Sequence, residues 1–173
     1  MMRYFVAFSL VLMAAVSRFL PHPPNVVPIT ALALFSGVYL QKRSAVLVPL
    51  AAMLVSDYFL GFSWGTPWVY ASFVVIGLGG LWLRNHRGVA QTVGASLLGS
   101  VLFYVITNFG VWVSSGMYPH TAPGLAECYA AAIPFFRNTI LGDLGYVGAM
   151  FSLFSLAERL LPSMGPEPAR GKS

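Results

Sequence analysis

The chain has 173 residues, of which 57% are hydrophobic and only 9% are charged. Soluble domains carry about 25% charged residues, so the composition excludes an ordinary soluble domain and predicts an integral membrane protein. The net charge of +5 does not indicate a nucleic-acid partner, because the lysines and arginines are scattered singly or in pairs between apolar runs. The single cysteine, Cys128, excludes an internal disulfide and any site built from several cysteines.

Apolar segments recur along the whole chain, and we predict that six of them are membrane-spanning helices. They cover residues 4–20, 26–40, 45–62, 68–83, 89–114 and 134–161. Backbone groups in lipid must be bonded within their own segment, and none of these runs alternates like a barrel strand. The fold class is therefore an all-α membrane protein, a compact bundle of six transmembrane helices in residues 1–162 with a disordered cytoplasmic tail in residues 163–173.

The start of the chain and the glycines add two expectations. Arg3 and the apolar run after it resemble a signal peptide, but the run is about long enough to cross a bilayer at 1.5 Å per residue, which favours an uncleaved first span. Small residues such as Gly77, Gly80 and Gly99 indicate close approach of membrane helices, within the bundle or at a partner interface.

The basic residues predict the orientation of the bundle. If the N-terminus lies inside, only Arg18 and Arg137 fall outside. The cytoplasmic segments then hold Arg3, Lys42, Arg43, Arg84, Arg87, Arg159, Arg170 and Lys172. This asymmetry follows the positive-inside rule. We expect a multi-pass protein of the bacterial inner membrane with both termini in the cytoplasm.

Polar and aromatic residues without a role in topology gather toward the predicted outer face. The candidate substrate-binding residues are Arg18, Asn25, Asp57, Trp64, Trp68, Asn108, Trp112, Arg137, Asn138, Asp143 and Tyr146. A charge at the centre of a bilayer costs about 2.5 to 3.5 kcal/mol on insertion scales, so such groups face the interior or pair. On a helical wheel, Asn138, Asp143 and Tyr146 share an arc with Thr139 and Gly142, whereas Arg137 lies off its edge.

Two interpretations of this polar set remain open at this point. The residues could be pairs that pin the helices together, or they could line an outward-facing pocket with aromatic walls. Residues 115–133 form a long outer loop in which residues 125–133 could be a short helix, either a lid or an ordinary interfacial helix.

Catalytic and metal motifs give little support for an enzyme. The sequence has no P-loop, no nucleophile elbow and no dinucleotide fingerprint, and no histidine pair has zinc-ligand spacing. We therefore expect no enzyme activity, no cofactor and no bound metal, although an outer metal site built from His22, His120 and a carboxylate stays open.

Four stretches carry a resemblance to known proteins. They are RFLPHPPNVVPITALALFSGVYL, AVLVPLAAMLVSDYFLGF, VLFYVITNFGVW and PFFRNTILGDLGY. They resemble a family of small bacterial membrane proteins of unknown function described as transport proteins, over residues 18–159. That family is in turn similar to the substrate-binding S components of energy-coupling factor transporters. S components carry an Ala-x-x-x-Ala pattern on the first helix, where this chain has Ala7, Val11 and Ala15.

The resemblance implies a six-helix protein that captures a vitamin-like or other small metabolite solute from the outer face for uptake. It also implies partners, namely a transmembrane coupling protein with two ATPases. A transporter that acts alone stays open, as do two other classes: an accessory subunit whose polar residues only pin helices, and a metal-dependent membrane enzyme. Arg18 or Arg137 would suit an anionic group on the solute.

Overall fold

The computed structural model describes residues 2–41, 43–63, 65–86 and 88–161. Its elements are α1 (Met2–Val16), the 3₁₀ helix η1 (Ser17–Phe19), α2 (Ile29–Tyr39), α3 (Ser44–Leu60), α4 (Thr66–Leu83), α5 (Val89–Ser114) and α6 (Ala122–Leu160). The described part of the chain contains no strand. Trp64, Lys42, Arg87 and the predicted tail lie outside the described residues.

Four helical segments are long and apolar enough to cross a membrane: Met2–Phe19, Thr66–Leu83, Val89–Ser114 and Ala122–Leu160. The apolar helices α2 and α3 are shorter. Large hydrophobic side chains also cover the outside of the bundle, among them Phe5 at 67% exposure and Leu141 at 59%. Soluble monomers rarely expose contiguous apolar surface on this scale. The all-helical bundle is thus that of a membrane protein.

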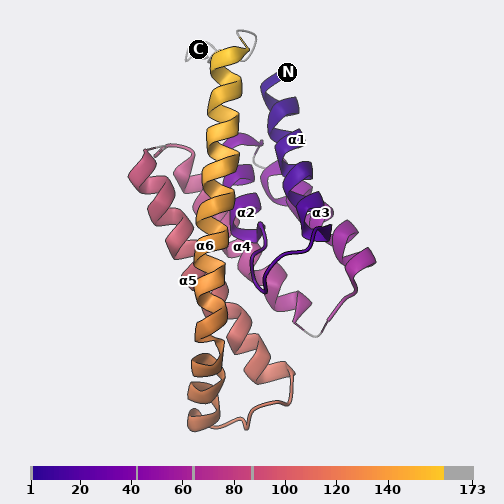
Figure 1. Cartoon of the computed structure of the whole chain (residues 1–173), viewed down its shortest axis with the longest axis vertical. Coiled ribbons are helices and arrows are strands. Elements are labelled where there is room, and N and C mark those ends of the chain that lie inside the picture. Colours follow the sequence, from indigo (N-terminus) through magenta and orange to yellow (C-terminus); the bar gives the residue numbers. More distant parts are fainter. Residues whose placement is uncertain (1, 42, 64, 87, 162–173) are drawn as a thin grey trace.

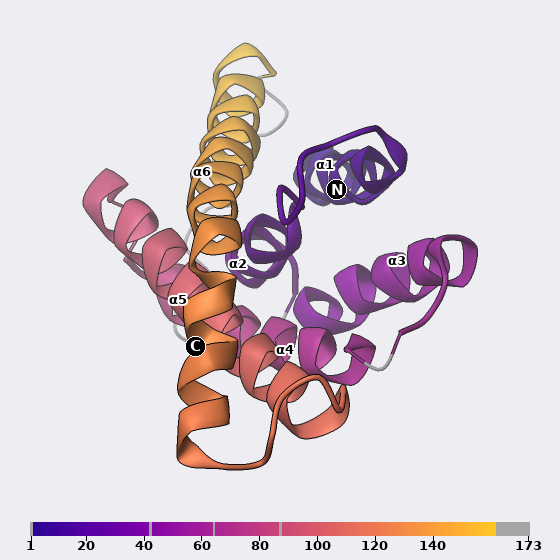
Figure 2. The same ribbon diagram turned by 60° about the horizontal axis from the view of Figure 1, so that its bottom comes forward.

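The short helix α2 lies at the centre of the bundle, with the other helices around it (Figure 2). Every residue from Ile29 to Val38 is buried. A helix that is apolar on all sides is stable only where it is enclosed by protein or lipid. The prolines before it, ending with Pro28 at the N-cap, place its start three residues later than predicted. The short helix α2 is thus the core of the bundle.

Close backbone contact and an arginine fix α2 to α4. A Cβ atom added at Gly37 would lie 2.6 Å from the backbone of Gly80, so only glycine permits this approach. Arg84 then donates to the carbonyl oxygens of Gly37 (2.6 Å) and Leu40 (2.5 Å). These carbonyls end the helix without intrahelical partners, and a cation there also complements the helix dipole. The predicted role in close packing within the bundle is confirmed for Gly80 and Gly99, whereas a Cβ added at Gly77 would meet nothing within 4 Å.

The long helix α6 corrects one prediction. We expected the last span to begin at Pro134, with a separate short helix before it, but α6 begins at Ala122 and runs through Pro134 for 39 residues. Thr121 caps its start, since its side chain accepts a hydrogen bond from the backbone N–H of Gly124. At 1.5 Å per residue the helix is about 58 Å long, well beyond the hydrocarbon core of about 30 Å. Residues 125–133, for which a lid and an interfacial helix were both open, are the first part of α6.

Both termini lie at one end of the molecule, and the connection between α5 and α6 lies at the other (Figure 1). We call these the terminal end and the hairpin end. The α5–α6 hairpin extends beyond the other helices there (Figure 1). Arg3, Arg43, Arg84 and Arg159 belong to the terminal end, as their places at or near the ends of α1, α3, α4 and α6 require.

Candidate functional site

Arg18 and Asp57 form a buried ion pair between η1 and α3. Arg18 Nη2 lies 2.5 Å from Asp57 Oδ1, and the side chains are only 12% and 9% exposed. Arg18 Nη1 also donates to the hydroxyl of Ser56. The second carboxylate oxygen of Asp57 accepts a hydrogen bond from the Tyr70 hydroxyl at 2.7 Å, which brings in α4. Both charges are thus partnered within the chain, and the cluster ties three helical elements together.

Asp143 forms a second, separate cluster. Its Oδ2 atom accepts hydrogen bonds from Thr30 of α2 at 2.9 Å and from Ser100 of α5 at 2.6 Å. The residue is 2% exposed. Thr30 lies in the first turn of α2, where the positive end of the helix dipole favours a carboxylate. Asp143 therefore joins α6 to α2 and α5, at the end of α2 opposite the one that Arg84 caps.

A cavity of about 240 Å³ lies between α4, α5 and α6, near the base of the protruding hairpin. It brings together two predicted site residues, Asn25 and Asn108, with Thr107, Tyr104 and Thr139. Its remaining lining is Gly65, Val69, Phe103, Val111, Ala132 and Phe135. Its volume is just below the usual range of about 300 to 1,000 Å³ for small-molecule sites, and apolar walls with a few placed polar groups are typical of them.

Three polar groups of this cavity donate hydrogen bonds to backbone carbonyls of α5 and α6. Asn108 Nδ2 donates to the carbonyl oxygen of Tyr104 at 2.8 Å, and the hydroxyls of Thr107 and Thr139 donate to the carbonyls four residues earlier, at 2.7 and 3.2 Å. The amide nitrogen must face a carbonyl oxygen, so the Asn108 orientation is fixed. The groups that no described residue uses are the acceptor lone pairs of Asn108 Oδ1 and of the two hydroxyls, the second N–H of Asn108 Nδ2, and the side-chain amide of Asn25.

The loop between η1 and α2 carries Asn25 into the cavity lining. Asn25 has a positive φ of 63°, a left-handed conformation that asparagine tolerates better than most residues. The loop is held by Asn138, whose Nδ2 donates to the carbonyl oxygen of Pro24 at 3.1 Å. Gly142 contributes as well, because a Cβ there would lie 3.1 Å from the Cα of Val26. Asn138 thus positions the loop and does not line the cavity.

Comparison with known protein families matches residues 1–164 to the family of unknown function DUF6580. The chain belongs to the family DUF6580. This agrees with the resemblance to proteins of unknown function, while nothing in the comparisons links the chain to S components. No curated protein and no solved structure matches it.

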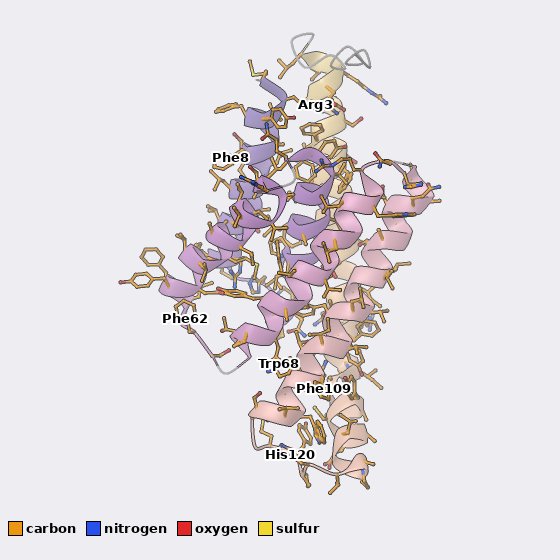
Figure 3. All side chains as sticks on the ribbon, turned by 180° about the vertical axis from the view of Figure 1, so that it is seen from behind. Arg3, Phe8, Phe62, Trp68, Phe109 and His120 are labelled. Atoms are coloured by element: carbon orange, nitrogen blue, oxygen red, sulfur yellow. The ribbon has the colours of Figure 1, made fainter. Side chains whose placement is uncertain are left out.

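The other predicted site residues of this DUF6580 protein lie outside the cavity. Trp68 packs against Gly110 and Phe109 and donates to the Ser114 hydroxyl at 3.0 Å (Figure 3). Tyr146 accepts a hydrogen bond from Ser17. Trp112 donates to the carbonyl oxygen of Pro119, and Arg137 is exposed. Trp64 is not among the described residues.

The burial of residues along α6 agrees with the arc that the helical wheel predicted. Thr139, Gly142 and Asp143 are buried and Tyr146 is partly buried, whereas Arg137 is exposed. What the sequence analysis missed is the set of uncharged partners: Tyr70, Thr30 and Ser100 for the carboxylates, and Thr107 and Tyr104 for the cavity. Hydroxyl groups in a membrane helix were the available signal, since they bond across helices or back to the backbone.

The hairpin beside the cavity is cross-linked by hydrogen bonds between α5 and α6. Tyr104 donates to the carbonyl oxygen of Tyr129 at 2.6 Å, and Tyr129 donates to that of Val105 at 2.7 Å. The Cys128 thiol lies 3.4 Å from the carbonyl oxygen of Asn108. These contacts tie the start of α6 to α5 beside the cavity.

Two further observations concern a partner protein and a metal ion. Ala7, Val11 and Ala15 of α1 are all buried in the core of this chain, so that face is occupied by the chain itself. Within the described ranges, no group of three or more His, Cys, Asp or Glu side chains could hold a metal ion.

Proposed function

We propose that this protein is a membrane-embedded solute-binding protein that captures a small metabolite or vitamin-like molecule in the cavity beside Asn108. The observation that carries the proposal is the contrast in that cavity between apolar walls and unused acceptor atoms on Asn108, Thr107 and Thr139. No residue that the structure describes donates to these acceptors. A solute with N–H or O–H groups would do so.

The solute of this proposal is uncharged. No ionisable acid or base lines the cavity apart from the Tyr104 phenol, whose hydrogen is already donated to Tyr129. Arg18 is neutralised by Asp57, and Arg137 is exposed away from the cavity lining. The arginines therefore do not support the anionic solute that the sequence alone favoured.

The proposal includes an orientation and an energy source. All six helices, with α2 enclosed by the others and α3 at the edge of the bundle, would form the membrane domain, with the hairpin end outside the bacterial inner membrane and both termini in the cytoplasm. The basic residues at the terminal end support this direction. Uptake would be energised by separate subunits, as the missing P-loop suggests, either through a coupling protein with two ATPases or by another arrangement.

The test is a binding screen on the purified full chain. A panel of vitamins and metabolites, neutral and anionic, is assayed by thermal shift and native mass spectrometry. We expect a neutral solute with several donors to bind the parent protein, to be lost in Asn108→Leu, and to be retained in Asn85→Leu. Asn85 is the matched control, because it is exposed in the turn after α4, at the terminal end.

Two results would count against the proposal. If no compound of the panel shifts the melting temperature and none copurifies, the cavity is not a capture site. If a solute binds equally well to Asn108→Leu, the site lies elsewhere.

A second function is favoured by a specific observation. Because Arg18, Asp57 and Asp143 are all bonded within the chain, they behave as pins between helices, which suits a structural or accessory membrane subunit. In that case Asn108→Leu would leave uptake by the intact membrane unchanged, and only the Arg18, Asp57 and Asp143 variants would lower the amount of folded protein.

A further inference from the structure

A second hollow lies at the other end of the molecule, between the first half of α5 and the last turns of α6. Its volume is about 500 Å³. The start of α5 lies apart from α6 there, as two views of the chain show (Figures 1 and 2). Both helices are candidate spans, so a bilayer crossed by α5 and α6 would surround this groove.

The groove changes in character along its length. Its deep part, toward the middle of the bundle, is apolar and lined by Val93, Leu144 and Val147. Toward the terminal end its lining includes the polar residues Thr92, Ser155 and Arg159 beside the apolar Val89 and Leu156. An apolar channel that ends in hydroxyls and a guanidinium is the shape and polarity of a phospholipid, with its acyl chain inside and its phosphate at the mouth.

Arg159 is available for such a phosphate. It is exposed, and no described residue forms an ion pair or hydrogen bond with it. Its neighbour Glu158 is engaged elsewhere, with Arg3 at 2.7 Å. The mouth of the groove therefore carries an unneutralised positive charge on the face of α6 that also presents Ser152 and Ser155.

Gly148 leaves room for the chain of a lipid. It lines the groove, and a Cβ added to it would meet nothing within 4 Å. The space beside it is therefore not needed for packing between helices, in contrast to Gly37, where a Cβ would clash with Gly80.

We propose that this groove is a binding site for an anionic phospholipid, whose phosphate is held by Arg159 with the hydroxyls of Ser155 and Thr92 and whose acyl chain lies along α6 past Gly148. The site is independent of the solute cavity, since the two share no lining residue.

The test uses the full chain in detergent, with native mass spectrometry as the readout. Phosphatidylglycerol and phosphatidylcholine with the same acyl chains are added at equal concentration, and inorganic phosphate is added as a separate competitor. We expect the parent protein to retain phosphatidylglycerol in preference to phosphatidylcholine. Arg159→Gln should lower phosphatidylglycerol binding about fivefold, which corresponds to about 1 kcal/mol for one basic residue near the membrane surface.

Matched variants separate a defined site from general attraction. Arg43→Gln removes the same charge from an exposed position at the terminal end but outside the groove, and should leave binding unchanged. Gly148→Leu fills the groove and should lower binding, whereas Gly145→Leu, where a Cβ also meets nothing within 4 Å, should not, because Gly145 does not line the groove.

Three results would overturn the proposal. Equal retention of the two lipids would remove the role of the charge. Equal loss in Arg43→Gln and Arg159→Gln would show only diffuse attraction to a basic end. Displacement of the lipid by millimolar inorganic phosphate would show a free-phosphate site in place of a lipid site.

Discussion

Two polar regions lie in this bundle, and they differ in what they leave free. The ionised groups Arg18, Asp57 and Asp143 bond to other parts of the chain, although the Nε atom of Arg18 is buried without a partner among the described residues. The polar groups that line the cavity beside Asn108 are uncharged, and no described residue donates to Asn108 Oδ1. The charged groups are thus paired within the chain, whereas the uncharged groups of the cavity keep atoms for a ligand.

The difference has a physical cause. An ionised side chain away from water costs several kcal/mol unless it is paired, so a resting protein without a ligand must neutralise it. An amide or hydroxyl oxygen costs much less to leave without a hydrogen-bond partner, particularly when the N–H or O–H of the same group is already donated to the backbone. A site that has to stand empty until a solute arrives is therefore more readily built from neutral groups.

The largest expected effect on stability comes from a substitution that breaks the ion pair between Arg18 and Asp57. Arg18→Met leaves Asp57 buried without its cation and should lower the free energy of unfolding by about 3 to 5 kcal/mol, the usual cost of removing one partner of a buried pair. Equilibrium unfolding in mixed micelles measures it. The double variant Arg18→Met/Asp57→Leu should be less destabilised than the single one. A loss below about 1 kcal/mol in the single variant would mean that the pair behaves like an exposed one.

A smaller effect is expected at the second cluster. Asp143→Ala deprives Thr30 and Ser100 of their shared acceptor and should cost about 2 kcal/mol, within the range for buried groups left unsatisfied. Asp143→Asn should cost less, because an amide oxygen in the place of Oδ2 can still accept both hydrogen bonds. The same thermal and chemical unfolding assays apply. Loss of solute binding with unchanged stability would instead make Asp143 a ligand contact.

Arg84 extends the comparison to the opposite end of α2. Arg84→Gln removes the cation from the carbonyl oxygens of Gly37 and Leu40, and should cost about 1 to 2 kcal/mol as for a charge at a partly buried helix C-terminus. Arg43→Gln is the control at the same end of the molecule. Equal melting temperatures for the two variants would show that the cap contributes nothing.

The smallest effect on stability is expected in the cavity. Thr107→Val keeps the shape of the side chain and removes one acceptor that no described residue uses, so the free energy of unfolding should change by less than about 0.5 kcal/mol. Solute affinity should nevertheless fall about fivefold, the value of one ordinary hydrogen bond. A large loss of stability would show that the hydroxyl holds helices together and is not a ligand contact.

The helices were largely predictable because each depends on local sequence. The fifth predicted helix agrees with α5 (Val89–Ser114) at both ends, since the apolar run is continuous and is preceded by Gly88. Pro134 misled the prediction for α6, although Pro49 inside α3 did not. Proline interrupts one hydrogen bond, and in a membrane helix the neighbouring turns can maintain the helix. Thr121 and Pro123 carried the true start signal.

The site was predictable only in part, because partners depend on how helices rotate against one another. Pairing of the arginines with the aspartates was one of the open interpretations. Arg18 does form an ion pair with Asp57, whereas Arg137 forms none with a described carboxylate. Asp143 is satisfied by Thr30 and Ser100, which come from helices distant in sequence. Asn25 and Asn108 were found as polar residues near one face, and their shared cavity required the packed structure.

The central claim is that the solute meets neutral acceptors and not the buried charges. One measurement tests it most directly: binding of the strongest solute of the panel to Asn108→Leu and to Arg18→Met/Asp57→Leu, each compared with the parent protein by native mass spectrometry. We predict that the solute is lost from Asn108→Leu and retained by the folded double variant. Retention by Asn108→Leu together with loss from the double variant would contradict the claim.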